Sequence, residues 1–262
     1  SEGSDTFYVP LVAHQRSTAS GLANSQIIIQ NTGSAVATAT VDLIDWFTGS
    51  LVYSKTGISV NPGASFLYDL ANEGNLPANW IGSAKLRAPG AQVAVVANFF
   101  MGPNGMQTFN GFPASRAGRN WVVPLFVSRL GNGLSAPVTV QNVSDQVIPV
   151  GGVVMTCKVD TTSPSQTPAT FVVSNTVPIS PSMSYAWNPV TGMSLPSNWL
   201  GSCRIETSAD TVAFVQLRFM GTDKTAAYEA LSGNSTDKTV VVPLVAKRLP
   251  NGFATAVTIQ NL

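Results

Sequence analysis

The amino-acid sequence predicts an all-β protein made of two tandem Ig-like antiparallel β-sandwich domains, followed by an extra C-terminal two-strand segment. Three observations lead to this prediction: short runs of alternating apolar and polar residues, Gly, Pro and Asn between the runs, and repetition of the same motifs over a long period. The chain has 262 residues, of which 44% are apolar, which is enough for two cores of ordinary domain size. Pro and Gly interrupt every candidate helix, so we expect little helix.

An opening motif occurs three times. In each copy Val-Pro-Leu is followed, after a further apolar run, by Gln-Asn. The Val-Pro-Leu copies are Val9-Pro10-Leu11, Val123-Pro124-Leu125 and Val242-Pro243-Leu244, and the Gln-Asn copies are Gln30-Asn31, Gln141-Asn142 and Gln260-Asn261. Each copy predicts two strands, so the chain contains three pairs of opening strands.

The remainder of the repeat occurs twice, with matching motifs separated by 119 residues. Such a period is too long for a solenoid unit of about 20 to 50 residues and suits a sandwich domain of about 100. The matching pairs are Leu76-Pro77 with Leu195-Pro196, Trp80 with Trp199, Gly82-Ser83 with Gly201-Ser202, and Phe100-Met101-Gly102 with Phe219-Met220-Gly221. We assign residues 1–119 to the first repeat, 120–239 to the second, and 240–262 to the opening strands of a third.

The alternation of residue types predicts which side chains face inward. In the first repeat, Ala84, Leu86 and Ala88 are expected inside. Aligning residues 94–100 with 213–219 predicts that Ala94, Val96, Asn98 and Phe100 also face inward. The opposite face then carries Val93, Val95, Ala97 and Phe99 in the first repeat, and Val212, Phe214, Gln216 and Arg218 in the second. An apolar outer face predicts a cover, which is either the other domain or another subunit.

The two cysteines are both expected to face the interior of the second repeat. Cys157 alternates with Thr156 and Lys158, and Cys203 precedes the outward Arg204. A disulfide between them would close a span of 46 residues and contribute ~4 kcal/mol in the chain-entropy estimate. Two unpaired buried thiols are the alternative.

The third opening segment needs partner strands, because an isolated pair of strands is marginal in water. Three arrangements are possible: the segment belongs to a longer array of repeats, it adds strands to a sheet within this molecule, or it pairs with a neighbouring molecule by strand addition. A related arrangement has each body take its opening strands from the following copy. The predicted assembly residues are Val242, Pro243, Leu244, Val257 and Ile259, together with Val93, Val95 and Phe99.

Catalytic and metal-binding patterns are not apparent in the sequence. The single histidine, His14, corresponds to Ser128 and Lys247 in the other copies, which predicts a solvated edge rather than a catalytic base. Two inward cysteines and one distant histidine do not form a zinc-binding pattern. We therefore expect no enzyme activity, no metal and no cofactor.

The five tryptophans divide into two groups. Trp80 and Trp199 occupy equivalent positions, which favours packing over ligand binding. Trp46, Trp121 and Trp187 have no counterpart in the other repeat and are the better candidates for contacting a ligand.

Charge and hydropathy exclude other functions. Charged residues make up only 10%, against roughly 25% in an average soluble protein. The net charge is +1, so no long-range field would attract nucleic acid or an anionic membrane. No run of about 18 apolar residues predicts membrane insertion. Residues 1–5 are polar, as at a mature N-terminus after removal of a signal peptide, so we expect a secreted, extracellular protein.

The repeats resemble those of secreted surface proteins of filamentous, Chloroflexus-like bacteria. In that family an opening with Pro-Leu-Val, Asn-Gly and Val-Gln-Asn leads to an Asp-aromatic-Gly turn, then to Pro-Gly-Ser, Leu-Pro and Gly-Ser-Ala, and to a closing Tyr-Asn-Gly. Here they correspond to Pro243-Leu244-Val245, Asp45-Trp46 with Thr48-Gly49, Pro62-Gly63-Ala64-Ser65, Leu76-Pro77, Gly82-Ser83-Ala84 and Phe109-Asn110-Gly111. The second repeat departs from them at Tyr228-Glu229-Ala230 and Cys203. The resemblance implies an exported surface protein.

Two functions follow as expectations. The first is an extracellular structural protein at the cell surface that self-assembles into a filament, sheath or surface layer, with copies of itself as partners. The second is an adhesin or carbohydrate-binding module on a rigid β-sandwich, with glycans as partners.

Overall fold

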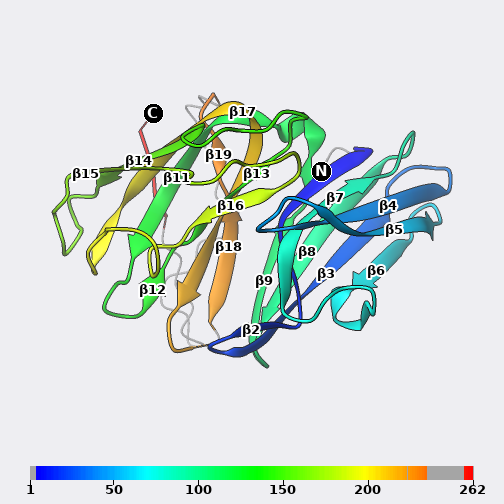
Figure 1. The fold of residues 1–262 in the computed structure, drawn as a ribbon, viewed down its shortest axis with the longest axis horizontal. Coiled ribbons are helices and arrows are strands. Elements are labelled where there is room, and N and C mark those ends of the chain that lie inside the picture. Colours follow the sequence, from blue (N-terminus) through cyan, green and yellow to red (C-terminus); the bar gives the residue numbers. More distant parts are fainter. Residues whose placement is uncertain (1–3, 223, 235–256, 262) are drawn as a thin grey trace.

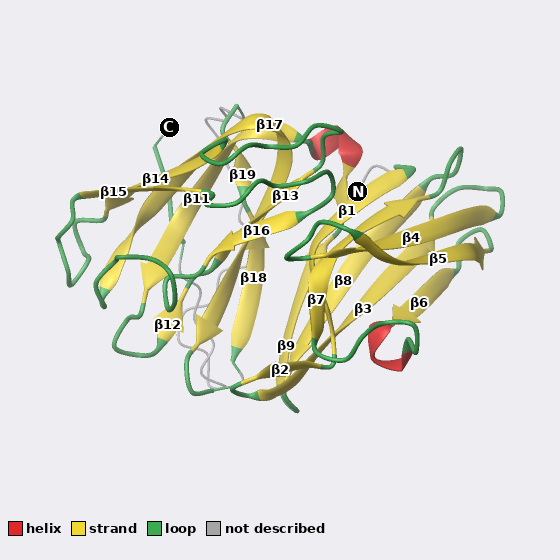
Figure 2. Cartoon of the chain, viewed as in Figure 1, coloured by secondary structure: helices red, strands yellow, loops and turns green. Residues whose placement is uncertain are grey.

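The computed structural model describes residues 4–222, 224–234 and 257–261, and these residues form an all-β fold of antiparallel sheets (Figures 1 and 2). Their helical elements are two single 3₁₀ turns, η1 (Leu70–Asn72) and η2 (Ala114–Arg116). The prediction of an all-β, antiparallel fold is therefore confirmed. Figure 1 shows two groups of strands side by side, one from the N-terminal half of the chain and one from the C-terminal half.

Two sheets form the N-terminal half. One has the order β10-β1-β7-β4-β5, and the other has the order β2-β3-β8-β9, with β6 beside β3. The strands are β1 (Thr6–His14), β2 (Arg16–Thr18), β3 (Gly21–Asn31), β4 (Ala37–Asp45), β5 (Leu51–Val60), β6 (Ser65–Asp69), β7 (Trp80–Arg87), β8 (Val93–Met101), β9 (Gly105–Asn110) and β10 (Phe112–Pro113).

The strands of the C-terminal half join into one nine-stranded sheet, whose main path is β15-β14-β17-β11-β19. Its long strand β17 pairs with β11 and β14 along its first part and with β13 and β18 along its last part. The strands are β11 (Gly118–Ser128), β12 (Leu134–Ser135), β13 (Val138–Asn142), β14 (Val153–Val159), β15 (Thr170–Ser174), β16 (Ser184–Trp187), β17 (Trp199–Phe219), β18 (Thr225–Glu229) and β19 (Leu231–Ser232).

Pro and Gly explain why β17 is continuous whereas its counterpart in the N-terminal half is divided. There, β7 and β8 are separated by residues 88–92, which include Pro89 and Gly90. Pro89 has no N–H to donate to a ladder, and Gly90 has a φ of 74°. The corresponding residues 207–210 contain neither Pro nor Gly, so the backbone continues as one strand.

Each half contains its own opening strands. β1 pairs with β7 and β10, and β11 makes the equivalent pairings with β17 and β19. The arrangement in which each body takes its opening strands from the following copy is therefore wrong for both described bodies. Of the third copy, Val242, Pro243 and Leu244 lie outside the described residues. Val257 and Ile259 are 53% and 90% exposed.

The prediction that Val93, Val95 and Phe99 line an outer face is wrong. All three are at most 3% exposed and belong to the core of the N-terminal half. Register places them there, because Ile29 lies opposite Val95 and Ser25 lies opposite Phe99, and both partners are buried. These three side chains are therefore unavailable to another molecule.

A one-residue register difference between the halves explains this error. Ile27 pairs with Ala97, yet its counterpart Val138 pairs with Val215 instead of Gln216, which lies 119 residues after Ala97. The segment at residues 207–210, which lies within β17, is one residue shorter than the connection at residues 88–92. A shift of one residue turns every side chain of a strand to the opposite face, so the motif alignment reversed the faces of β8.

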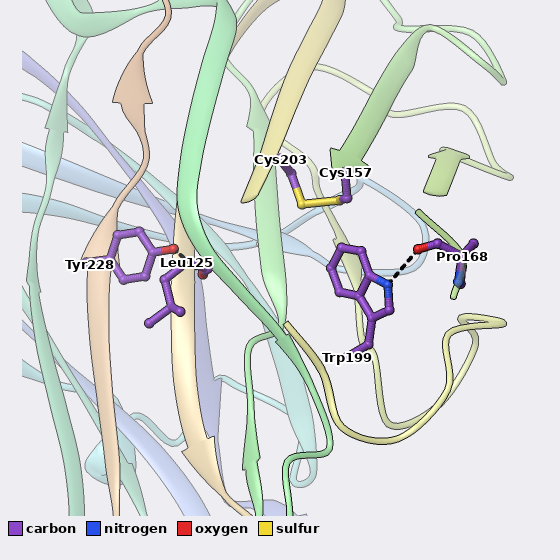
Figure 3. Close-up of a disulfide and its surroundings, with 6 residues drawn as sticks. All are labelled: Leu125, Cys157, Pro168, Trp199, Cys203 and Tyr228. Carbon is purple, nitrogen blue, oxygen red and sulfur yellow. Dashed lines mark hydrogen bonds between the residues drawn. A yellow bond between two sulfur atoms is a disulfide. The ribbon is translucent and has the colours of Figure 1, made fainter. Parts of the chain in front are cut away.

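The disulfide between Cys157 and Cys203 is formed, as predicted (Figure 3). The two residues lie opposite each other on β14 and β17, and both are buried. The corresponding position in the N-terminal half places Leu43 opposite Ala84. The disulfide thus occupies a place that apolar packing fills in the other half.

Trp80 and Trp199 are core residues, as predicted, and each depends on a glycine two residues later. A Cβ on Gly82 would lie 2.1 Å from the Ile44 carbonyl oxygen, and one on Gly201 would lie 2.1 Å from the Lys158 carbonyl oxygen. The tryptophan ring also lies within 2.4 Å of that Cβ position in both halves. Trp199 Nε1 donates to the Pro168 carbonyl oxygen at 2.9 Å (Figure 3).

We predict that Gly201→Ala destabilises the protein by ~3 kcal/mol, the upper end of the usual cost of overpacking, because backbone as well as the indole must move. Urea unfolding followed by tryptophan fluorescence measures the change. Gly74→Ala is the matched control, since no atom lies within 4 Å of its Cβ position. Equal stabilities of the two variants would contradict the close packing described for Gly201.

Candidate binding cleft between the two halves

The two halves of the chain are joined by aromatic packing. Phe109 of β9 stacks on Phe214 of β17, with ring centroids 4.8 Å apart and an angle of 25° between the rings. Phe214 and Val212 belong to the hydrophobic core of the N-terminal half, whereas Ala213 and Val215 belong to the core of the C-terminal half. β17 therefore contributes side chains to both cores.

Buried hydrogen bonds fix the orientation of the halves. The carbonyl oxygen of Ser182 accepts from Ser83 Oγ at 2.6 Å and from Gln141 Nε2 at 2.9 Å. Gln141 Nε2 also donates to the Ala84 carbonyl oxygen at 3.3 Å. Because a buried polar group loses its hydration, its partners must be in place, and these bonds define one arrangement of the two halves.

Polar contacts also lie at the edge of the interface. Glu229 accepts a hydrogen bond from Asn110 at 2.9 Å and forms an ion pair with Arg116 at 2.9 Å. The Tyr8 hydroxyl donates to the Val143 carbonyl oxygen at 3.2 Å. Exposed ion pairs contribute little to stability, so these contacts refine the orientation that the buried groups set.

A cleft of about 520 Å³ lies along this interface and receives residues from both halves. Its volume lies within the ~300–1,000 Å³ range of small-molecule sites. The lining residues are Leu11, Arg16, Trp46, Phe47 and Ile81 from the N-terminal half, and Pro137, Thr139, Val173, Ser174, Thr176, Tyr185, Ala186, Trp187, Asn188, Thr191, Gly192, Gln216 and Arg218 from the C-terminal half.

A tight turn holds the aromatic residues of the N-terminal wall. Asp45 Oδ1 accepts from the backbone N–H groups of Phe47 and Thr48 at 3.0 and 2.9 Å, as expected for an Asp-initiated turn. Gly49 closes the turn with a φ of 69°. This geometry keeps Trp46 half-buried at the cleft and leaves Phe47 69% exposed.

Tyr185 and Trp187 form the aromatic part of the opposite wall. Their rings meet edge to face, with centroids 5.4 Å apart. Two of the three tryptophans predicted to contact a ligand, Trp46 and Trp187, are among the cleft residues. Trp187 is only 3% exposed and belongs to the C-terminal core, so the accessible aromatic surface comes from Trp46 and Tyr185. The third, Trp121, is 2% exposed in the C-terminal core and donates to Thr211 Oγ1 at 2.9 Å.

Arg218 supplies positive charge to the cleft. One terminal nitrogen, Nη2, donates to Gln216 Oε1 at 2.7 Å. Nε of Arg218 and Nε2 of Gln216 are buried and have no hydrogen-bond partner. Burial lowers the pKa of Arg218 to about 10, so the guanidinium remains charged at neutral pH.

Sequence reasoning placed Gln216 and Arg218 on a face directed away from the core of their own repeat, and the structure places them on the face toward the N-terminal half. Their role as cleft residues was missed. One feature of the sequence could have identified them as cleft residues: along one face of the strand, the apolar Val212 and Phe214 are followed by the polar Gln216 and Arg218.

The prediction of a solvated edge at His14 is wrong. His14 is 4% exposed, and its Nδ1 lies 2.6 Å from the Leu70 carbonyl oxygen. Its counterpart Ser128 is fully buried. Both positions face the interior at the end of an opening strand.

A second, shallower pocket of about 300 Å³ is lined by His14 and Glu73. Burial opposes ionisation of Glu73, but hydrogen bonds from Asn75 and Tyr68 and the charge of Lys55 outweigh it and lower its pKa. The carboxylate accepts from Tyr68 at 3.0 Å and from Asn75 at 2.7 Å. Its oxygens are thus occupied by structural partners.

Comparisons with known proteins add little. No protein-family model matches the chain, and no curated protein matches it. The crystal structure of Thermotoga maritima 1070 is similar over 42% of this chain and 95% of that chain, with 16% identity and a TM-score of 0.34. Red sea bream transglutaminase is similar over 87% of this chain and 31% of that chain, with 12% identity and a TM-score of 0.19. Neither likeness supports an argument about this chain.

No helix in the described part of the chain has the length and apolar character needed to cross a membrane.

We predict that Phe214→Ala destabilises the N-terminal half, although the residue belongs to a strand of the C-terminal half. Truncating a buried phenylalanine costs ~3–5 kcal/mol, and here the lost contacts are those with Phe109 and its neighbours. Hydrogen exchange measured by mass spectrometry should show faster exchange in β8 and β9. Val215→Ala is the control, because its side chain packs in the C-terminal core. Faster exchange confined to the C-terminal half in both variants would contradict the shared-core description.

Proposed function

We propose that this chain is an extracellular carbohydrate-binding module, in which two Ig-like sandwich domains are held rigidly and bind a glycan in the cleft between them. The observation that carries the proposal is the gathering of the partly exposed Trp46 and Tyr185 with polar side chains in one cleft of about 520 Å³. Aromatic faces bury apolar sugar surfaces, and convergent polar groups hydrogen-bond to hydroxyl groups.

The rigidity of the pair supports this function. Buried hydrogen bonds through the Ser182 carbonyl oxygen hold the walls in one arrangement, so little conformational entropy is lost on binding. The disulfide between Cys157 and Cys203 is typical of proteins that function in an oxidising, extracellular compartment.

We predict that Trp46→Ala weakens glycan binding by about 30-fold, which corresponds to the ~2 kcal/mol typical of an aromatic anchor. Affinity electrophoresis of the full chain through gels containing soluble polysaccharides identifies a ligand, and calorimetry then measures the affinity. Leu51→Ala is the control, because Leu51 is 57% exposed close to the same turn and does not line the cleft. Equal binding by both variants would place the glycan elsewhere.

Self-assembly into a filament, sheath or surface layer is the second candidate function. One observation favours it: both halves already contain opening strands from the first two copies of the opening motif. These strands are β1 and β3 in the N-terminal half, and β11 and β13 in the C-terminal half. The third copy, residues 240–262, is therefore not needed to complete either half. Strand addition to a sheet edge of another molecule would use it.

We predict that deleting residues 240–262 abolishes this assembly and leaves the two halves folded. Electron microscopy and sedimentation velocity compare the full chain with the truncated chain. A thermal melt followed by circular dichroism checks that the truncated chain retains its fold. Polymers that persist after the deletion would exclude the segment from the mechanism, and a monomeric full chain would exclude self-assembly.

A further inference from the structure

Arg218 lines the cleft and, like Arg16, Arg129 and Arg204, forms no ion pair among the described residues. Arg87, Arg116 and Arg119 form ion pairs with Asp42, Glu229 and Asp210. Nε of Arg218 is buried without an acceptor. A buried guanidinium without an acidic partner is costly, which is a reason to look for an anion that completes the site.

Gln216 provides a second free donor beside the guanidinium. The two residues lie on the same face of β17, and Arg218 Nη2 binds Gln216 Oε1. That bond leaves the Gln216 amide nitrogen, Nε2, as a donor, and this nitrogen is buried and has no partner. The Gln216 side chain is only 2% exposed and lines the cleft. Two buried donors therefore lack acceptors at one place.

The rest of the cleft favours an anion as the missing acceptor. No Asp or Glu is among its lining residues, and Arg16 adds a second cationic side chain. An arginine fork matches the two oxygens of a carboxylate, and hydrogen bonds to a charged acceptor are stronger than neutral ones. Trp46 and Tyr185, both partly exposed, supply the apolar surface against which a sugar ring packs.

We propose that the cleft recognises a uronic acid residue of an acidic polysaccharide, with its carboxylate bound by Arg218 and Gln216 and its ring packed against the aromatic walls. This inference rests on the proposed glycan-binding function and names its ligand class. A neutral sugar would leave both buried donors without an anionic acceptor, so the carboxylate is the feature that distinguishes the ligand.

The test uses a galacturonate trimer and its methyl ester, in which each carboxylate is replaced by an uncharged ester on the same sugar backbone. Calorimetry with the full chain should give binding of the trimer and affinity at least about tenfold lower for the ester. Arg218→Gln should lower affinity for the trimer by a similar factor. Arg218→Lys keeps the charge without the fork and should bind with intermediate affinity.

Arg204→Gln is the matched control, because it removes one positive charge from an exposed residue that does not line the cleft. Its affinity for the trimer should equal that of the unmodified chain. If Arg218→Gln does not fold, Gln216→Met replaces it, since this variant removes the amide donor at similar side-chain length. It should bind the trimer at least about threefold more weakly.

The outcomes separate this inference from the function on which it rests. Equal binding of the trimer and its ester, unaffected by Arg218→Gln or Gln216→Met, would overturn the inference. Failure to bind the trimer, with Trp46-dependent binding of a neutral glycan, would also overturn it and leave the proposed function intact. Failure of all glycans to bind would overturn both.

Discussion

Burial of both faces of β17 is the constraint on which the rest of the structure depends. Ala213 and Val215 pack in the C-terminal core, and Val212 and Phe214 pack in the N-terminal core on the other side of the same strand. A strand covered on both faces is apolar along its whole buried length, which explains the run from Val212 to Val215. Where the apolar run ends, Gln216 and Arg218 follow on the same face of the strand and line the cleft between the halves.

The fold could be predicted from the sequence where local and long-range patterns agree. Alternation around Cys157 and Cys203 placed both thiols inside, and they form the disulfide. Repetition identified Trp80 and Trp199 as packing residues, and both are buried. The faces of β8 could not be predicted, because the alignment relied on the motif Phe100-Met101-Gly102 at the end of the strand. The segment that precedes the strand differs by one residue between the halves, and this difference changes the register of the strand without changing the motif.

The candidate site could be predicted only in part. Trp46 and Trp187 were identified because motif alignment gave them no counterpart in the other repeat. For Trp187 that reasoning is wrong, because strand pairing makes the buried Tyr68 its counterpart and both residues pack in the cores. The proximity of Trp46 and Trp187 could not be predicted, since it depends on how the two halves dock. Arg218 was placed on the correct face, but whether an arginine has an acidic partner is decided by tertiary contacts. His14 was predicted at a solvated edge because its counterparts are Ser128 and Lys247, yet a short polar side chain can be buried at the end of a strand as well.

The packing between the halves also bears on how such a chain could evolve. Duplication begins with two identical units, but the two copies here are no longer equivalent. The second copy has one residue fewer before the part of β17 that carries Phe214, and it has Glu229 where the first copy has Asn110. One copy has become a donor of a docking face and the other has become its acceptor. Recombination that exchanged the two copies would pair surfaces that do not match. A further unit that docked on this pair in the same way would therefore need a surface adapted to the face that it covers.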